Sequence, residues 1–489
     1  MKSEKVLAFF REIVCIPRES GHEEHIRAYL QKFAADRNLE CKTDEAGNVL
    51  IIKPAAKGCE DRPTVILQSH LDMVCEKVKG YEHDFAKDPI KYEIRDGWMV
   101  ADNTTLGADC GIGIASELAI LDDPSLKFGK LECLFTASEE TGMDGAFGLQ
   151  PGFLEGKILV NLDSEDEGQL FIGCAGGINT TATFFYDPTP LEGEKEYMLF
   201  TVEGGIGGHS GDDIDKGRAN ALSLLARFLH QVIDFEDVEL CSIDGGGKRN
   251  AIPRDCSAVL AFDPISKGGI MEIFERFAAE IKDEFALTDP GMHAYATPAS
   301  WETDAIDHDV ATDLIEAMVA VPNGVLAMSA ELKGIVETSS NLASVHMGKT
   351  EDEELADLYG ESCITVATSQ RSCINSAREW AAQRVEATFD LAGAMVTHES
   401  RYPGWKPKME SYILDVSRNS YRRLFGVEPI VRSIHAGLEC GLFLDKYPDL
   451  DMISFGPTLR GVHAPGEKLE LASLDKFWDL LLDVLDNIR

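Results

Sequence analysis

The strongest constraint on the fold is a set of three short apolar segments, at residues 64–68, 131–137 and 158–162. Each is rich in Val, Ile, Leu or Phe and shows little polar alternation, which is typical of strands covered on both faces in a parallel sheet. Residues 111–121 lie between two of them and have the composition of a helix that ends near Pro124. Strands that alternate with helices predict an α/β domain, with a mostly parallel central sheet flanked by helices.

A chain of 489 residues is too long for one ordinary domain of about 100–200 residues. Residues 178–394 show strand-like and helix-like patterns of their own, which predict a smaller α+β domain. After this segment, residues 409–425 form an amphipathic helical pattern, and strand-like runs of the first kind return. We therefore predict one α/β domain, made of residues 1–177 and 395–489, that is interrupted by an inserted domain.

Charge and hydropathy argue against several classes of function. The chain has 46 Lys and Arg against 84 Asp and Glu, so its formal net charge is −38 at pH 7. A surface this negative repels nucleic-acid phosphates, and no apolar stretch reaches the ~18–20 residues of a membrane span. The first residues lack the apolar block of a secretory signal, and the 12 cysteines are scattered without a CxxC pair. We therefore expect a cytoplasmic protein with reduced thiols that binds neither nucleic acid nor membrane.

Acidic and imidazole side chains collect where the predicted strands end. Each of the three apolar segments is followed at once by such residues, another opens the helix at 111–121, and a last one follows the strand-like run at 452–455. The carboxyl ends of the strands form the ligand-binding edge of an open α/β sheet, so we expect these side chains to meet. The set comprises His70, Asp72, Asp109, Glu139, Glu140, Asp163 and His463.

Several carboxylates at one edge of a sheet repel one another unless a cation neutralises them. The mixture of His, Asp and Glu suits zinc, with manganese or cobalt as alternatives. Counting ligands favours two ions that share one carboxylate. One ion would take His70 and Asp163, the other would take Glu140 and His463, and Asp109 would bridge them.

Each of these residues has a simpler structural explanation when it is considered alone. A His-x-Asp pair is usually a surface hydrogen bond, although Asp72 would also suit the second ring nitrogen of a metal-binding His70. A Glu-Glu pair in an acidic chain is usually solvated. Nucleophilic-serine chemistry fails on spacing, because Asp212 stands where a GxSxG motif needs its second glycine. The glycine-rich segment before His209 instead predicts a flexible turn that presents this imidazole.

Longer strings resemble the co-catalytic zinc peptidases of the M20 clan, and in particular the aminoacyl-histidine dipeptidase branch, also called peptidase D or Xaa-His dipeptidase. The resemblance extends from about residue 10 to 485 and implies a catalytic domain at 1–177 and 395–489 with a lid or dimerisation domain at 178–394. The strings are Ser-His-Leu-Asp-Met-Val (69–74), Gly-Ala-Asp-Cys-Gly-Ile-Gly (107–113), Thr-Ala-Ser-Glu-Glu-Thr-Gly (136–142), Ile-Gly-Cys-Ala-Gly-Gly (172–177), Gly-Gly-His-Ser-Gly (207–211) and His-Ala-Gly-Leu-Glu-Cys-Gly (435–441).

The resemblance also implies roles for individual residues. Glu139 would be the general base, and His209 would reach the scissile carbonyl, from its own subunit or across a dimer. Asn250, Gly437 and Arg371 would contact substrate, with Arg371 as a clamp for the terminal carboxylate. The residues that the resemblance implies as zinc ligands are His70, Asp109, Glu140, Asp163 and His463. The chain departs from many relatives at Cys110, which replaces an Asn after the bridging carboxylate.

The implied activity is hydrolysis of dipeptides with a free carboxyl terminus, of Xaa-His type and broad specificity, by a homodimer with two Zn²⁺ per subunit. A water between the ions would lose its proton to Glu139 and attack the peptide carbonyl. Two related activities stay open: an aminotripeptidase and an N-acyl amino-acid deacylase. A metal- or peptide-binding protein without activity is the alternative of another class.

Overall fold

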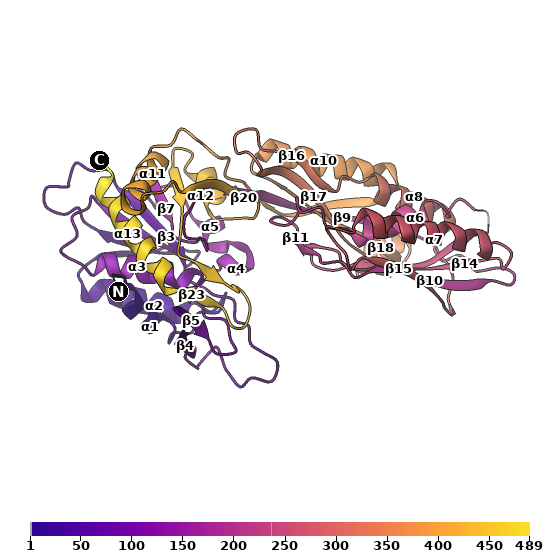
Figure 1. The fold of residues 1–489 in the computed structure, drawn as a ribbon, viewed down its shortest axis with the longest axis horizontal. Coiled ribbons are helices and arrows are strands. Elements are labelled where there is room, and N and C mark those ends of the chain that lie inside the picture. Colours follow the sequence, from indigo (N-terminus) through magenta and orange to yellow (C-terminus); the bar gives the residue numbers. More distant parts are fainter. Residues whose placement is uncertain (1, 236) are drawn as a thin grey trace. The chain divides into compact units, whose positions relative to one another are not determined.

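The structure is a computed structural model that describes residues 2–235 and 237–489. The chain divides into two compact units, each of which is described by itself (Figure 1). The first contains the residues up to Cys174 together with Trp405–Ser433 and Leu438–Arg489. The second contains Ala175–Gly404 and Ile434–Gly437.

The first unit is built on an eight-stranded mixed sheet with the strand order β1-β2-β6-β3-β7-β21-β8-β20. Its central strands β6, β3, β7 and β21 are parallel, whereas β1, β2 and β8 pair in antiparallel fashion. Every residue of β3, β6 and β7 is buried, so both faces of the sheet are covered. The strands are β1 (Glu40–Thr43), β2 (Val49–Lys53), β3 (Val65–His70), β6 (Leu131–Thr136), β7 (Ile158–Asn161), β8 (Gln169–Cys174), β20 (Ile430–Ile434) and β21 (Asp451–Ser454).

Helices and a small second sheet complete the first unit. Strands β22 (Leu459–Arg460), β23 (Lys468–Glu470), β5 (Trp98–Ala101) and β4 (Tyr92–Arg95) form an antiparallel four-stranded sheet. Helix α3 packs on β3 and on α1, and α11 packs on α13. The helices are α1 (Glu4–Ile13), α2 (Glu24–Asp36), α3 (Ala108–Leu121), α4 (Glu139–Gly142), α5 (Asp144–Gly148), α11 (Tyr412–Phe425), α12 (Cys440–Lys446) and α13 (Leu471–Asn487).

The second unit is an antiparallel sheet covered by helices. Its strand order is β15-β10-β14-β12-β17-β18-β9-β19, with β16 paired to β17 and a separate β11–β13 ribbon. Figure 1 shows α6, α7 and α8 side by side along this sheet, and the buried residues of all three helices share one core with its strands, including aromatic residues of α6 and α7. The strands are β9 (Gly176–Phe185), β10 (Glu196–Glu203), β11 (Gly208–His209), β12 (Glu239–Gly246), β13 (Ala251–Ile252), β14 (Cys256–Phe262), β15 (His293–Pro298), β16 (Gly324–Met328), β17 (Val336–Lys349), β18 (Ser362–Ser372) and β19 (Met395–Tyr402). The helices are α6 (Ala221–Leu229), α7 (Lys267–Glu284), α8 (His308–Ala320), α9 (Glu353–Tyr359) and α10 (Asn375–Leu391).

The fold class predicted from the sequence is confirmed, and so is the mostly parallel centre of the first sheet. The domain limits differ from the predicted ones. Residues 395–402 form β19, which pairs with β9, so the second unit extends to Gly404 rather than ending at 394. The short return of Ile434–Gly437 to this unit has no counterpart in the prediction.

Two properties of the whole chain bear on the sequence analysis. None of the 12 cysteines, all of which are described, takes part in a disulfide bond. Among the described residues, no helix combines the length and the apolar character that a membrane span requires.

Candidate functional site

Parallel strand ends bring the predicted metal ligands together in the first unit. His70 is the last residue of β3, Glu139 and Glu140 open α4 directly after β6, and Asp163 follows β7 by two residues. Because β6, β3 and β7 are neighbouring parallel strands, their carboxyl ends lie at one edge of the sheet. Asp109 reaches the same place from the start of α3.

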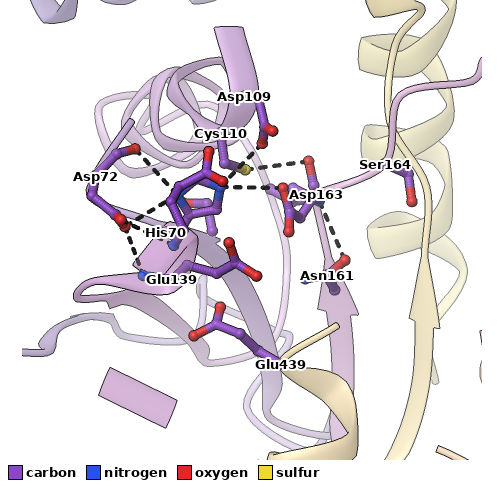
Figure 2. Close-up of polar contacts among 12 residues, drawn as sticks. His70, Asp72, Asp109, Cys110, Glu139, Asn161, Asp163, Ser164 and Glu439 are labelled. Carbon is purple, nitrogen blue, oxygen red and sulfur yellow. Dashed lines mark hydrogen bonds and ion pairs between the residues drawn. The ribbon is translucent and has the colours of Figure 1, made fainter. Parts of the chain in front are cut away.

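The short distances divide the predicted ligands into two groups that share Asp109. His70 Nε2 lies 3.0 Å from Asp109 Oδ1 and 3.4 Å from Asp163 Oδ1 (Figure 2). His463 Nε2 lies 3.2 Å from the other oxygen, Asp109 Oδ2, and 2.8 Å from Glu140 Oε2. One carboxylate thus faces two imidazoles, one through each oxygen, as a bridging ligand must.

The electrostatics of this cluster require positive charge. The hydrogen bonds that His463 donates to Asp109 and Glu140 raise its pKa to about 11. Burial lowers the pKa of His70. The negative charge of Asp163 and the hydrogen bonds of the His70 ring to Asp109 and Asp163 outweigh this effect and raise the pKa of His70 well above its usual range. The surrounding carboxylates thus hold protons on both imidazoles, and a bound divalent cation would supply the same compensation.

The donor atoms also fit a metal ion. Ligand atoms of Asp109, Glu140 and His463 all lie within 4.8 Å of one another, and so do those of His70, Asp109 and Asp163. Glu140 Oε1 is buried and has no hydrogen-bond partner among the described residues. The set contains nitrogen and carboxylate oxygen donors, which is the chemistry that zinc sites use.

Asp72 connects the His70 ring to the turn that carries the two glutamates. Its Oδ1 lies 3.3 Å from His70 Nδ1, and it accepts hydrogen bonds from the backbone N–H groups of Glu139 and Glu140 at 2.9 and 3.1 Å. The Ser20 hydroxyl also donates to Asp72, at 2.8 Å. Burial raises the pKa of Asp72, but its bonds to His70, Ser20 and Glu139 outweigh this and lower it to about 2. Asp72 is therefore an ionised anchor.

Glu139 differs from its neighbours because its carboxylate makes no ion pair in the described part of the chain. Burial raises its pKa well above the usual range, and the charges of Asp163, Glu439 and Glu140 act in the same direction. Glu439 extends from the start of α12 toward Glu139 (Figure 2). Its Oε2 is held by Gln68 and Thr136 at 2.6 and 2.8 Å, whereas its buried Oε1 has no partner among the described residues. The sequence analysis missed Glu439, although it lies in the quoted 435–441 string.

Two further buried residues hold the turn before Asp109, and the sequence analysis missed both. Arg18 is 2% exposed and donates to the carbonyl oxygens of Leu71, Asp72 and Gly107. Glu467, also 2% exposed, accepts hydrogen bonds from consecutive backbone N–H groups at the start of α3. Its partners are Leu106 (2.8 Å), Gly107 (3.0 Å), Ala108 (2.8 Å) and Asp109 (3.4 Å).

His209, Asn250, Arg371 and Gly437 all belong to the second unit, whereas the candidate metal ligands belong to the first. His209 is in β11, which pairs with β13, and the backbone N–H of Ser210 donates to the carbonyl oxygen of Asn250. The backbone N–H groups of Gly211 and Asp212 both donate to His209 Nδ1, at 3.2 Å. An acceptor at Nδ1 means that the neutral ring carries its proton on Nε2.

Arg371 is a buried cation without an acidic partner in the described part of the chain. Its Nη1 donates to the Tyr402 hydroxyl at 3.1 Å, and its buried Nε makes no hydrogen bond to any described residue. Gly437 packs against the same tyrosine, because a Cβ at this position would lie 3.0 Å from the Tyr402 ring. Burial and the charge of Arg371 lower the pKa of His209, and they lower that of His435 to about 3. The second unit thus gathers a guanidinium and two neutral imidazoles.

Comparison with known proteins fixes the family. The model of Peptidase family M20/M25/M40 matches residues 66–487. The chain belongs to this family. It is 39% identical over 479 residues to the cytosol non-specific dipeptidase of Escherichia coli (strain K12), a match that covers 98% of this chain and 96% of that protein.

Solved structures agree with this assignment. The fold is similar to the crystal structure of aminoacylhistidine dipeptidase from Vibrio alginolyticus, with a TM-score of 0.90 and 38% identity over 100% of this chain and 98% of the other. Aminopeptidase PepT from Bacillus cereus ATCC 10987 shares the fold, with a TM-score of 0.62 and 17% identity over 99% and 98% of the two chains. The predicted M20 metallopeptidase is confirmed.

Cys110 directly follows Asp109 and lies inside the candidate metal cluster. Its thiol is close enough to His70, Asp109 and Asp163 to belong to the same group of possible metal ligands. Burial raises the pKa of Cys110 well above its usual range, and its Sγ donates to the Leu162 carbonyl oxygen at 3.6 Å. A neutral thiol is a poor zinc ligand, so these features favour a packing role for Cys110.

Proposed function

We propose that this protein is a metal-dependent dipeptidase of the cytoplasm that cleaves dipeptides with a free carboxyl terminus, including Xaa-His dipeptides. The observation that supports this most is the position of Asp109 between two imidazoles, at 3.0 and 3.2 Å from different oxygens. The relatives described as cytosol non-specific dipeptidase and aminoacylhistidine dipeptidase cover almost the whole chain, which supports the substrate class and the compartment.

The proposed cofactor is a pair of Zn²⁺ ions, with Mn²⁺ or Co²⁺ as alternatives. His70 and Asp163 would hold one ion, Glu140 and His463 the other, and Asp109 both. When bound, such ions lower the pKa of water and polarise a peptide carbonyl. Asp72 would fix the His70 ring through Nδ1, which is the usual partner of a metal-binding imidazole.

Glu139 is the proposed general base. It is adjacent to the ligand Glu140, and its backbone N–H is bonded to Asp72, so its position is fixed without its carboxylate being used. Glu139 would accept the proton of the attacking water and return it to the leaving amine.

His209 and Arg371 would bind the substrate. His209 would donate its Nε2–H to the scissile carbonyl oxygen, and a neutral imidazole is suited to this because it stabilises the developing charge as a donor. Arg371 would hold the terminal carboxylate, which would supply the anion that this buried guanidinium lacks. Asn250 and Gly437 would contact the substrate backbone. A homodimer formed through residues 178–394 stays a prediction that sedimentation would test.

The deciding experiment measures metal content and cleavage on the same preparation. We expect two zinc ions per chain and turnover of Xaa-His and other dipeptides, with slow or no cleavage of tripeptides and acetylated amino acids. Preference for tripeptides would indicate an aminotripeptidase, and preference for acetyl amino acids would indicate a deacylase. Glu139→Ala should keep both ions and lose nearly all turnover. Wild-type activity of the Glu139→Ala protein would contradict the assignment of Glu139 as the general base.

A further inference from the structure

Glu439 is a fully buried glutamate of the first unit that faces the proposed general base. It directly precedes α12, its exposed fraction is 0%, and Figure 2 shows its carboxyl group pointing toward that of Glu139. One of its oxygens, Oε1, is buried and makes no hydrogen bond to any described residue. A buried polar atom without a partner costs free energy, so the presence of a glutamate at this position needs an explanation.

A buried hydrogen-bond network fixes which oxygen of Glu439 accepts. The backbone N–H of Asp163 donates to Asn161 Oδ1 at 3.3 Å, which orients the Asn161 amide, and Asn161 Nδ2 then donates to Gln68 Oε1 at 2.6 Å. Gln68 therefore presents its NH₂ group to Glu439 Oε2, at 2.6 Å. The same NH₂ group donates to the Thr136 hydroxyl oxygen at 3.1 Å, and this hydroxyl donates to Glu439 Oε2 at 2.8 Å. Both groups at Oε2 are donors, so Oε2 acts as an acceptor.

The protonated, neutral form of Glu439 suits these surroundings. Its two partners are an amide and a hydroxyl, and it forms no ion pair with a described Lys, Arg or His. Burial raises the pKa of Glu439 to about 8, against the opposing effects of the His70 charge and of the Thr136 hydrogen bond. Because donors occupy Oε2, the proton belongs on Oε1. A carboxyl group in this form can donate a hydrogen bond from Oε1.

Glu139 is the group that such a donor would serve. A general base has to be ionised before it can accept a proton. An ionised Glu439 would oppose the ionisation of Glu139, since like charges close together disfavour each other, whereas a hydrogen bond from a neutral Glu439 favours the carboxylate of Glu139. Glu139 is partly exposed and Glu439 is fully buried, so a proton held by the pair is retained on Glu439.

We propose that Glu439 is a positioning residue that keeps its proton and donates a hydrogen bond from Oε1 to the carboxylate of Glu139. This hydrogen bond orients Glu139 and stabilises the ionised form in which it accepts a proton from water. Glu439 has no exposed surface with which to contact a substrate, so it acts through Glu139 alone. The inference rests on the proposed function, in which Glu139 is the general base.

Two substitutions of Glu439 separate a neutral donor from a negative charge. In Glu439→Gln, the amide oxygen takes the Oε2 position, where two donors meet it, and the NH₂ group replaces the donor toward Glu139. We expect Glu439→Gln to keep kcat within about three-fold of the wild type. Glu439→Leu has no donor and should lower kcat about 10–100-fold with little change in KM. Equal losses in both variants, or wild-type kcat in Glu439→Leu, would overturn the proposal.

Glu117→Leu is the matched control for damage to the core. Glu117 is also 0% exposed, its Oε1 accepts from the Ser69 hydroxyl at 2.7 Å, and its Oε2 makes no hydrogen bond to any described residue. The two leucine variants thus remove the same kind of buried group. Both should bind as much zinc as the wild type and unfold cooperatively in urea, and Glu117→Leu should keep wild-type kcat. Equal losses of kcat in the two leucine variants would show general damage and overturn the assigned role.

The protonation of Glu439 is tested without any activity measurement. A protonated carboxyl group has an infrared C=O stretching band that an ionised one lacks. In the zinc-loaded full chain at neutral pH, the difference spectrum between the wild type and Glu439→Gln should show the loss of one such band. A difference spectrum without this band would mean that Glu439 is ionised and would overturn the proposal. Absence of all dipeptide cleavage by the wild type would instead reject the proposed function, and the role of Glu439 with it, while the band would still report a protonated Glu439.

Discussion

Replacement of Glu467 by glutamine tests how Asp109, the proposed bridging ligand, is positioned. Each carboxylate oxygen of Glu467 accepts two backbone N–H groups at the start of α3. The amide introduced by Glu467→Gln keeps one accepting oxygen and places an NH₂ group where the other stood, so two buried N–H groups lose their acceptor. A buried unsatisfied donor costs about 1–3 kcal/mol, which gives a loss of about 2–6 kcal/mol in the free energy of unfolding. Freeing the Asp109 turn should also weaken zinc binding about 10–100-fold.

The assay has two parts and a matched control. Urea unfolding of metal-free protein measures the stability change, and competition with a chromophoric chelator measures zinc affinity. Glu470 follows three residues later, and its carboxylate makes no hydrogen bond within the described chain, so Glu470→Gln should change neither quantity. A Glu467→Gln protein with the stability and the zinc affinity of the wild type would refute the assignment of Glu467 as the anchor of Asp109.

Three other outcomes are expected. Arg371→Met should raise KM for dipeptides with a free carboxyl terminus far more than for amidated dipeptides, and equal effects in steady-state assays would contradict the carboxylate clamp. His435 has a folded-state pKa of about 3 against ~6.5 unfolded, so wild-type stability should fall relative to His435→Gln by about 1.4 kcal/mol per pH unit between about pH 6 and 4. Urea unfolding at several pH values measures this stability difference. A difference that does not change with pH would contradict the assignment of His435 as a buried, neutral imidazole. Removal of zinc by a chelator should lower the melting temperature, because metal at 100 times its Kd stabilises the native state by about 2.7 kcal/mol; a scan that shows no shift would argue against a metal site.

The sequence predicted that the candidate metal ligands meet at one edge of the sheet, because their position depends on local pattern. Buried parallel strands are readable as apolar runs, and their ends fall at one edge by geometry alone. His70 and Asp163 are therefore placed by the strands that precede them. His463 was the least constrained, since a loop containing β22 separates it from β21, the strand that it was predicted to follow.

The supporting residues were not predictable in the same way. Arg18 lies outside the quoted strings, and Glu439 lies in the 435–441 string but was given no role there. Each acts through partners distant in the chain, such as Leu71 and Gln68. A buried arginine or glutamate has no distinct sequence pattern. The second unit extends beyond residue 394 for a related reason, because the edge strand β19 belongs to this unit only through its pairing with β9.

The turn at Gly107 shows why ligand identity and ligand position are encoded separately. The backbone of Gly107 donates to Glu467 and accepts from Arg18, so two opposite charges hold it from two sides. Its φ of +66° favours glycine, and a Cβ there would lie 2.5 Å from the Arg18 side chain and 2.7 Å from Met73. The string at 107–113 supplies the carboxylate of Asp109, but its orientation depends on charged residues about 90 and 360 positions away. Changes at either distant residue should therefore alter metal affinity while every ligand stays in place.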